Sequence, residues 1–144
     1  MIPVPDRFLA EEIAKKARES LSTYCINTCK AQCCRKGKLL LQNEKELETI
    51  AETKKEKAFK EKILEKTPFG NYTYNLEKQS CPHLKKDWTC AIHKEERRPQ
   101  ICSDYPLFLV KNKFILANSC PGVRENLLTE YSKELKEKAH FKEL

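Results

Sequence analysis

Apolar residues recur at helical spacing near the start of the chain, and Asp6 stands where the N-cap of such a helix belongs. Four of them share one predicted face: Leu9, Ile13, Ala17 and Leu21. The pattern therefore predicts a helix that begins after Asp6. The stretch 25–34 reads as a further helical turn or two that ends near Gly37, because glycine commonly follows a helix C-terminus.

Residues 38–76 carry two predicted strands on either side of a long predicted helix. The short apolar stretch 38–42 predicts the first strand. Asn43 and Glu46 form an N-cap pair that starts a helix extending to about Lys66. An apolar stripe supports the first half of this helix: Leu47, Ile50, Ala51 and Ala58. Residues 67–71 contain proline and glycine and end it, and the alternating residues 72–76 predict the second strand.

The second half of the chain predicts irregular structure, a hairpin and a final helix. Prolines punctuate residues 81–105, residues 107–110 and 114–117 flank a short turn, and 123–141 show helical periodicity. The periodic positions of that final helix are Leu127, Leu128, Tyr131 and Leu135. The predicted fold class is α+β, with helices packed around a short antiparallel hairpin or sheet and a cysteine-rich loop region. We expect one small domain over residues 1–144.

Composition and charge narrow the classes of partner and location. The formal net charge is +7, but the lysines of residues 54–66 alternate with glutamates, so this run is a mixed-sign face and we do not expect nucleic-acid binding. No apolar run reaches the roughly 20 residues of a membrane span, so we expect no membrane partner. The N-terminus is charged by Asp6 and lacks the apolar core of a signal peptide, which favours a cytoplasmic location with reduced thiols.

Eight cysteines dominate the candidate chemistry, four of them within the ten residues CINTCKAQCC. They are Cys25, Cys29, Cys33, Cys34, Cys81, Cys90, Cys102 and Cys120. If residues 25–34 form an α-helix, the first three thiols fall within roughly 80° of one another on one stripe, and Cys34 lies about 100° further round. Such a stripe needs partner thiols from distant segments, so we expect all eight cysteines to lie close together.

Three interpretations of these thiols compete. An even number of cysteines is typical of a disulfide scaffold, but the adjacent pair Cys33–Cys34 and the missing signal peptide disfavour disulfides. Packing as small hydrophobes does not explain the clustering. Thiolates are soft ligands that select zinc and iron–sulfur clusters, so metal binding is the favoured interpretation. Ferredoxin, zinc-ribbon and radical-SAM spacings are all absent, which leaves an iron–sulfur cluster or zinc open, in one site or two.

The cysteines also stand in contexts that resemble a known family. CINTCKAQCC is followed by SCPHL, CAIH, RRPQICSDYP and a final CPG. This order resembles the small cysteine-cluster (CxxCxxCC-type) family of zinc- or iron-chelating proteins, from Cys25 to Gly122. The resemblance implies that all eight cysteines serve as metal ligands. Flagellin lysine N-methylases carry a related cysteine cluster, so the resemblance also opens a link to protein modification, with a protein substrate or partner.

A few other polar residues lie near the cysteines in sequence. His83 and His93 are candidate ligands, or donors that orient a ligand. His93, Asp104 and Tyr105 are candidates for acid–base work, and Arg98 is a candidate donor to cluster sulfurs or to an anion. If the protein is an enzyme, we expect His93, Asp104, Tyr105 and Arg98 to face the thiols across a pocket.

The sequence leaves three functional hypotheses open. The leading hypothesis is a protein that binds an iron–sulfur cluster or zinc through up to eight thiolates. The second is an iron–sulfur oxidoreductase or a protein-modifying, lysine N-methylase-like enzyme. The third is a zinc-stabilised binding module without chemistry. Neither the substrate nor the oligomeric state follows from the sequence.

Overall fold

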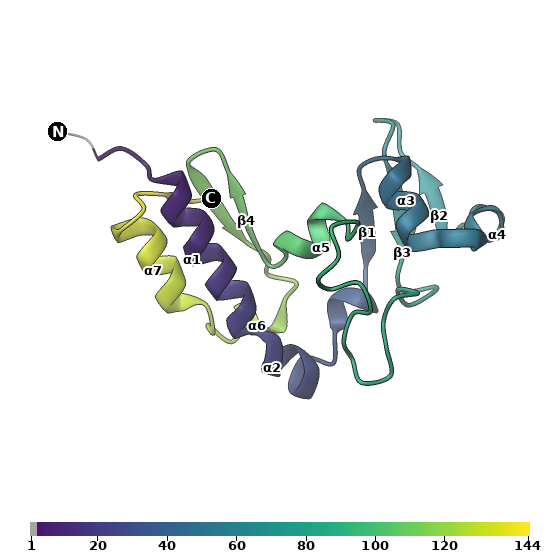
Figure 1. Ribbon diagram of the computed structural model, residues 1–144, viewed down its shortest axis with the longest axis horizontal. Helices are drawn as coiled ribbons and strands as arrows, with labels where there is room; N and C mark the ends of the chain where they lie inside the picture. The colour runs from purple at the N-terminus through teal and green to yellow at the C-terminus, as the bar shows by residue number, and fades with distance from the viewer. Residues whose placement is uncertain (1–2) are drawn as a thin grey trace. The chain divides into compact units, whose positions relative to one another are not determined.

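The computed structural model describes residues 3–144, which form two compact units (Figure 1). The terminal unit comprises residues 3–29 and 104–144, and the middle unit comprises residues 30–103. Each unit combines helices with a three-stranded sheet, which confirms the α+β class. Within residues 3–144 no helix has both the length and the apolar character needed to cross a membrane.

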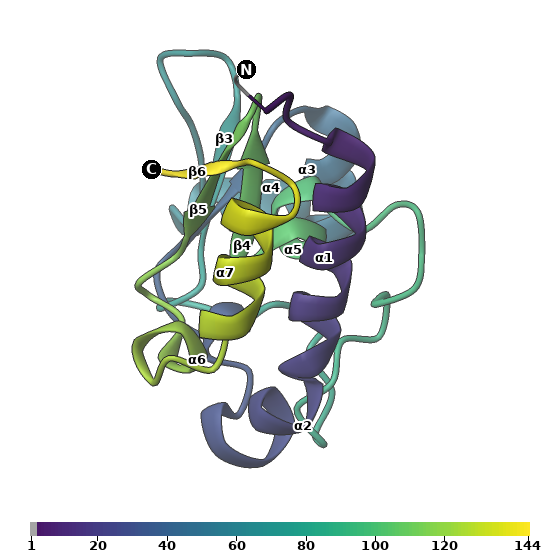
Figure 2. The same ribbon diagram turned by 90° about the vertical axis from the view of Figure 1, so that its left-hand side faces the viewer.

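The terminal unit packs two helices against a small sheet. Its elements are α1 (Arg7–Ser20), α2 (Ser22–Tyr24), β4 (Leu107–Val110), β5 (Lys113–Leu116), α6 (Pro121–Arg124), α7 (Thr129–Glu137) and β6 (Lys142–Glu143). Strands β4 and β5 form the predicted antiparallel hairpin, and β6 adds to β5 in parallel. Helices α1 and α7 lie side by side, and α1 packs against β4 (Figures 1 and 2).

Helix α1 forms as its sequence pattern predicts. The Asp6 carboxylate accepts a hydrogen bond of 3.0 Å from the Leu9 N–H, which satisfies one of the free donors at the helix start. The apolar face of α1 joins a core whose fully buried members include Leu107, Phe114 and Leu135. Burial of each such side chain contributes about 1.5–3 kcal/mol, so this core holds the unit together.

The predicted final helix over 123–141 is wrong as a continuous element. A short helix, α6, starts earlier, at Pro121, and the chain turns through the left-handed Asn126 before α7 begins at Thr129. The turn buries Leu128 and leaves Leu127 45% exposed. Burial of Leu128 therefore accompanies the break in the helix.

The middle unit is built on an antiparallel sheet with the order β1-β3-β2. Its elements are a 3₁₀ turn (Gln32–Cys34), β1 (Lys38–Leu41), α3 (Glu44–Ala51), a second 3₁₀ turn (Glu52–Lys54), α4 (Lys55–Lys60), β2 (Leu64–Lys66), β3 (Tyr72–Asn75) and α5 (Gln100–Asp104), which ends at the boundary with the terminal unit. Leu39 and Leu64 both pair with Tyr74 across the sheet. Helix α3 supplies Leu47 and Ile50 to the same core.

The predicted helix to Lys66 is also wrong as one continuous element, because it breaks at Glu52 and α4 ends at Lys60. Glu52 adopts φ 51° and Lys62 adopts φ 59°, and both values interrupt a helix. Leu64 then pairs with Tyr74 in β2 and is only 1% exposed. Pairing in the sheet buries Leu64, whereas a continuous helix would carry it away from its apolar stripe, so tertiary packing overrides helix propensity here.

Glu46 connects the start of α3 to the start of α5. Its N–H donates to the Asn43 side chain at 2.9 Å, which confirms the predicted N-cap. One carboxylate oxygen accepts the Gln42 N–H and the other accepts the Gln100 N–H, both at 2.9 Å. Because α5 carries Cys102, Glu46 fixes the backbone that presents this thiol.

The single helix predicted over residues 25–34 is wrong. A π-helix covers Cys25–Cys29, Lys30 and Ala31 follow with φ 53° each, and the 3₁₀ turn Gln32–Cys34 completes the segment. Left-handed backbone at two residues with side chains reverses the path of the chain. The predicted stripe of three thiols is therefore lost: Cys25 and Cys29 belong to the terminal unit, and Cys33 and Cys34 belong to the middle unit.

Gly122 allows the segment after Cys120 to approach the end of the first helical region. A Cβ atom at this position would lie 2.9 Å from Cδ2 of Leu21 and 3.5 Å from the ring of Tyr24. Helix α6 packs here against the π-helix that carries Cys25 and Cys29. The glycine thus sets how closely Cys120 can approach those two thiols.

We predict that Gly122→Ala lowers the free energy of unfolding by about 1–3 kcal/mol through overpacking against Leu21. Chemical denaturation of the metal-free protein measures this change. In a Leu21→Ala background the same substitution should cost clearly less, because the clashing methyl group is gone. Equal costs in both backgrounds would contradict the close contact.

Candidate metal centre

Five thiols from four segments gather in the middle unit: Cys33, Cys34, Cys81, Cys90 and Cys102. Their proximity is visible in their electrostatics, because the thiols shift one another's pKa values. The backbone joins two of the segments directly: the Cys81 N–H donates to the Cys34 carbonyl at 2.9 Å. Segments far apart in the sequence thus meet at the Cys33–Cys34 pair, and the prediction that all eight cysteines lie close together stays a prediction.

The two thiols of the adjacent pair Cys33–Cys34 differ in pKa. A hydrogen bond from Cys34 lowers the pKa of Cys33 to about 7, and the positive charge of Arg98 lowers it by a smaller amount. The same hydrogen bond, together with burial and the neighbouring thiols, raises the pKa of Cys34 far above its ordinary value. Cys33 is exposed and Cys34 is half-buried. Cys33 is therefore the more acidic thiol of the pair.

Two more thiols are held in apolar surroundings. Burial raises the pKa of Cys81, and burial raises that of Cys102 to about 12. The nearby backbone N–H groups of His83 and Leu84 partly offset this effect on the pKa of Cys81. Such N–H donors stabilise a bound thiolate, so the SCPHL segment is shaped to hold sulfur in its charged form.

His83 holds segments of this part of the site together. Its Nε2 atom is engaged in a hydrogen bond and is not placed to bind a metal. Its ring is 6% exposed, and Nε2 donates to the Thr49 carbonyl at 2.6 Å and lies 3.4 Å from a carboxylate oxygen of Glu52. Its carbonyl accepts the Ala91 N–H at 2.8 Å, next to Cys90. His83 therefore ties the Cys81 and Cys90 segments to the end of α3.

The loop between these two cysteines is a tight hairpin. Leu84 and Cys90 form a bridge, and the Lys85 N–H donates to the Thr89 carbonyl at 2.8 Å. The guanidinium of Arg35 lies over the Trp88 ring at 5.1 Å. Because Arg35 follows the Cys33–Cys34 pair directly, this stacking holds the pair near the hairpin and shields one side of the thiols.

Arg98, predicted as a donor to cluster sulfurs or to an anion, is half-buried in the same unit as the five thiols. The leading influence on the pKa is the hydrogen bond from Cys34 for Cys33 and burial for Cys102. The positive charge of Arg98 lowers both pKa values by a smaller amount. Its Nε atom is buried and makes no hydrogen bond to any residue in the part of the chain that the structure describes. His93 is exposed, and partial burial, then the charges of Arg98 and Lys94, lower its pKa.

The remaining three cysteines belong to the terminal unit: Cys25, Cys29 and Cys120. Cys29 and Cys120 are buried, and Cys25 packs against the core of this unit. Burial, a hydrogen bond with Glu125 and the proximity of Cys29 and Cys120 raise the pKa of Tyr24. These contacts place Tyr24 beside two of the three thiols, a neighbour that the sequence analysis did not identify.

Asp104 and Tyr105 have structural partners in the terminal unit. Arg18 donates to the carbonyls of Asp104 and Leu107, and its guanidinium lies 3.9 Å from the Asp104 carboxylate. The Tyr105 hydroxyl shares a hydrogen bond of 2.8 Å with Ser119. These contacts anchor the hairpin to α1 and to the segment before Cys120.

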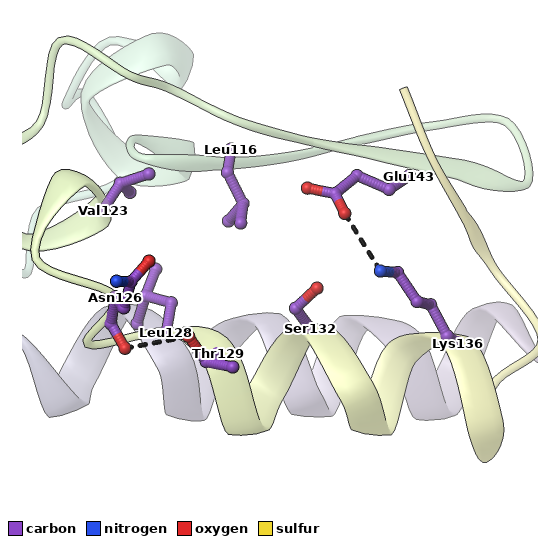
Figure 3. A pocket seen from close by; sticks show the side chains of 8 residues that line it. All are labelled: Leu116, Val123, Asn126, Leu128, Thr129, Ser132, Lys136 and Glu143. Atoms are coloured by element: carbon purple, nitrogen blue, oxygen red, sulfur yellow. Dashed lines mark hydrogen bonds and ion pairs between the residues drawn. The ribbon is translucent and has the colours of Figure 1, made fainter.

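Two cavities lie away from the thiols. One of about 250 Å³ in the terminal unit is lined by residues of β5, α6, α7 and β6, with the Lys136–Glu143 ion pair of 3.1 Å at its side (Figure 3). The other, of about 440 Å³, lies beside α3 and α4 in the middle unit. Neither is lined by a cysteine or by His93, Arg98, Asp104 or Tyr105. The expected pocket between these four residues and the thiols is not one of these cavities.

The five thiols of the middle unit are the type of ligand that a soft metal prefers. Within residues 3–144 no three Cys, His, Asp or Glu side chains are arranged tightly enough to enclose an ion. The five thiols nevertheless supply more than the four soft donors that zinc or an iron–sulfur cluster takes from a protein. N–H groups near Cys81 and the buried Arg98 nitrogen match the negative charge that such thiolates carry.

Comparison with known proteins agrees with this chemistry. Residues 24–121, about two-thirds of the chain, match the family model CxxCxxCC, described as "Putative zinc- or iron-chelating domain". Neither the curated proteins nor the solved structures contain a match to the chain. On the strength of the family match, the chain belongs to the CxxCxxCC family of zinc- or iron-chelating domains.

Proposed function

We propose that the protein holds zinc or an iron–sulfur cluster through thiolates of Cys33, Cys34, Cys81, Cys90 and Cys102. The observation that carries the proposal is the gathering of these five thiols, from four segments, in one compact unit. Burial of so many like-charged donors is costly unless a cation binds them. When bound, zinc supplies a structural tie or a Lewis acid, and an iron–sulfur cluster supplies electron transfer.

Cys25, Cys29 and Cys120 form a second thiol set in the terminal unit, and we propose them as further ligands. A single metal-binding domain over residues 1–144, the use of all eight thiols and a cytoplasmic location stay predictions. Arg18 and Ser119 hold Asp104 and Tyr105 in structural contacts, which supports a metal-binding protein over acid–base work by these two side chains. A lysine N-methylase-like activity stays an alternative hypothesis.

Full-length protein prepared without oxygen should contain zinc or iron in at least about one centre per chain, since thiolate sites bind with roughly 10–16 kcal/mol at pH 7. Elemental analysis measures the metal, and a brown colour with acid-labile sulfide identifies an iron–sulfur cluster. Cys81→Ser should remove most of the metal, whereas Ser80→Ala, its exposed neighbour, should keep it. Metal-free wild-type protein, or full metal content in Cys81→Ser, would overturn the proposal.

His83→Ala should lower metal affinity by about 10–100-fold, because the His83 ring anchors the Cys81 segment to the Thr49 carbonyl of α3. Competition with a chelator measures the affinity. His93→Ala, which removes an exposed ring close to Cys90 in sequence, should stay within about twofold of wild type by this argument. If the two substitutions were equivalent, or if His93→Ala were the more damaging, His83 would not be the residue that positions these thiols.

A further inference from the structure

Arg98 is half-buried, its Nε atom is buried, and it has no counter-charge among the described residues. Its Nε atom is inaccessible to solvent and has no hydrogen-bond partner in residues 3–144. No carboxylate of that part of the chain forms an ion pair with it, whereas the neighbouring Arg97 pairs with Glu95 at 2.8 Å. A buried cationic donor left unpaired is unfavourable, so its retention here calls for an anionic partner.

The surroundings of Arg98 indicate the chemistry of that partner. Pro99, buried directly after Arg98, accepts the Cys102 N–H at 3.0 Å, so Arg98 lies within one turn of this thiol. Its charge favours the thiolate forms of Cys33 and Cys102. The Cys102 sulfur becomes negative when it binds metal, so a thiolate is the kind of anion that this turn brings near Arg98.

We infer that Arg98 is the charge-compensating donor of the metal centre, with its guanidinium directed at metal-bound sulfur of Cys33 or Cys102. This inference rests on the proposed thiolate centre. Four thiolates around a dication carry a net charge of −2, which is costly to bury. Arg98 offsets one of these charges, and its Nε–H provides a hydrogen bond that strengthens when the sulfur is a thiolate.

An arginine suits this role better than a lysine. The planar guanidinium is always protonated and is less strongly hydrated than an ammonium group, so it can stay charged in a buried site. It also carries donors in fixed directions, so Nε can face one sulfur while the terminal nitrogens remain available to a second. Arg98→Lys therefore separates the contribution of charge from that of the Nε donor.

The test uses full-length protein loaded anaerobically with cobalt(II), whose thiolate complexes absorb visible light. Four proteins are compared: wild type, Arg98→Gln, Arg98→Lys and the matched control Arg97→Gln. Chelator competition gives the affinity for cobalt(II), and the sulfur-to-cobalt charge-transfer band reports hydrogen bonding to the bound thiolates. A purely structural role of Arg98 would leave the position of that band unchanged in variants that still bind.

We expect Arg98→Gln to lose about 10–100-fold in affinity and to shift the charge-transfer band, in the range typical of residues that support metal ligands. Arg98→Lys should recover part of the affinity but not the band position, and Arg97→Gln should match wild type. If Arg98→Gln does not fold, Arg98→Lys carries the test through its band shift.

The two proposals fail in different ways. Wild-type affinity with an unmoved band in the Arg98 variants, while wild type binds cobalt(II), would overturn the role of Arg98 and leave the thiolate centre standing. An equal loss in Arg97→Gln would also overturn it, because general surface charge would then suffice. Absence of cobalt binding in the wild type would overturn the thiolate centre itself, and the role of Arg98 with it.

Discussion

Mutual repulsion among closely spaced thiolates is the constraint on which this structure depends. Cys81 and Cys102 are held in apolar surroundings that favour the neutral thiol, and each is close to other thiols that disfavour a second negative charge. Thiols this close together can all become thiolates only when a cation is bound among them. The proposed metal binding would therefore be coupled to the folding of the middle unit.

The backbone prepares the thiols for that cation. Left-handed Lys30 and Ala31 turn the chain so that the Cys34 carbonyl receives the Cys81 N–H. His83 joins the Cys81 and Cys90 segments to α3, and Glu46 ties the start of α5 to the same helix. Each of these hydrogen bonds has at least one backbone partner, so a small sheet and one helix suffice to position thiols from four parts of the chain.

Sequence patterns predicted the regular elements but not where they are interrupted. Helix α1, strand β1 and the β4–β5 hairpin follow from periodicity and capping. The breaks at Glu52, Asn126 and Lys30–Ala31 do not, because no glycine or proline marks them and long-range burial decides them. The sequence shows which cysteines stand in the family's motifs. The division of the eight into five in the middle unit and three in the terminal unit depends on the left-handed turn after Cys29, which the sequence does not predict.

X-ray absorption spectroscopy at the metal edge of the anaerobically loaded, full-length protein tests the thiolate centre most directly, because it counts the atoms bound to the metal. The account predicts a first shell made of sulfur, at about 2.3 Å if the metal is zinc. A shell dominated by nitrogen or oxygen at about 2.0–2.2 Å would contradict it, because the five gathered thiols would then not be the metal ligands.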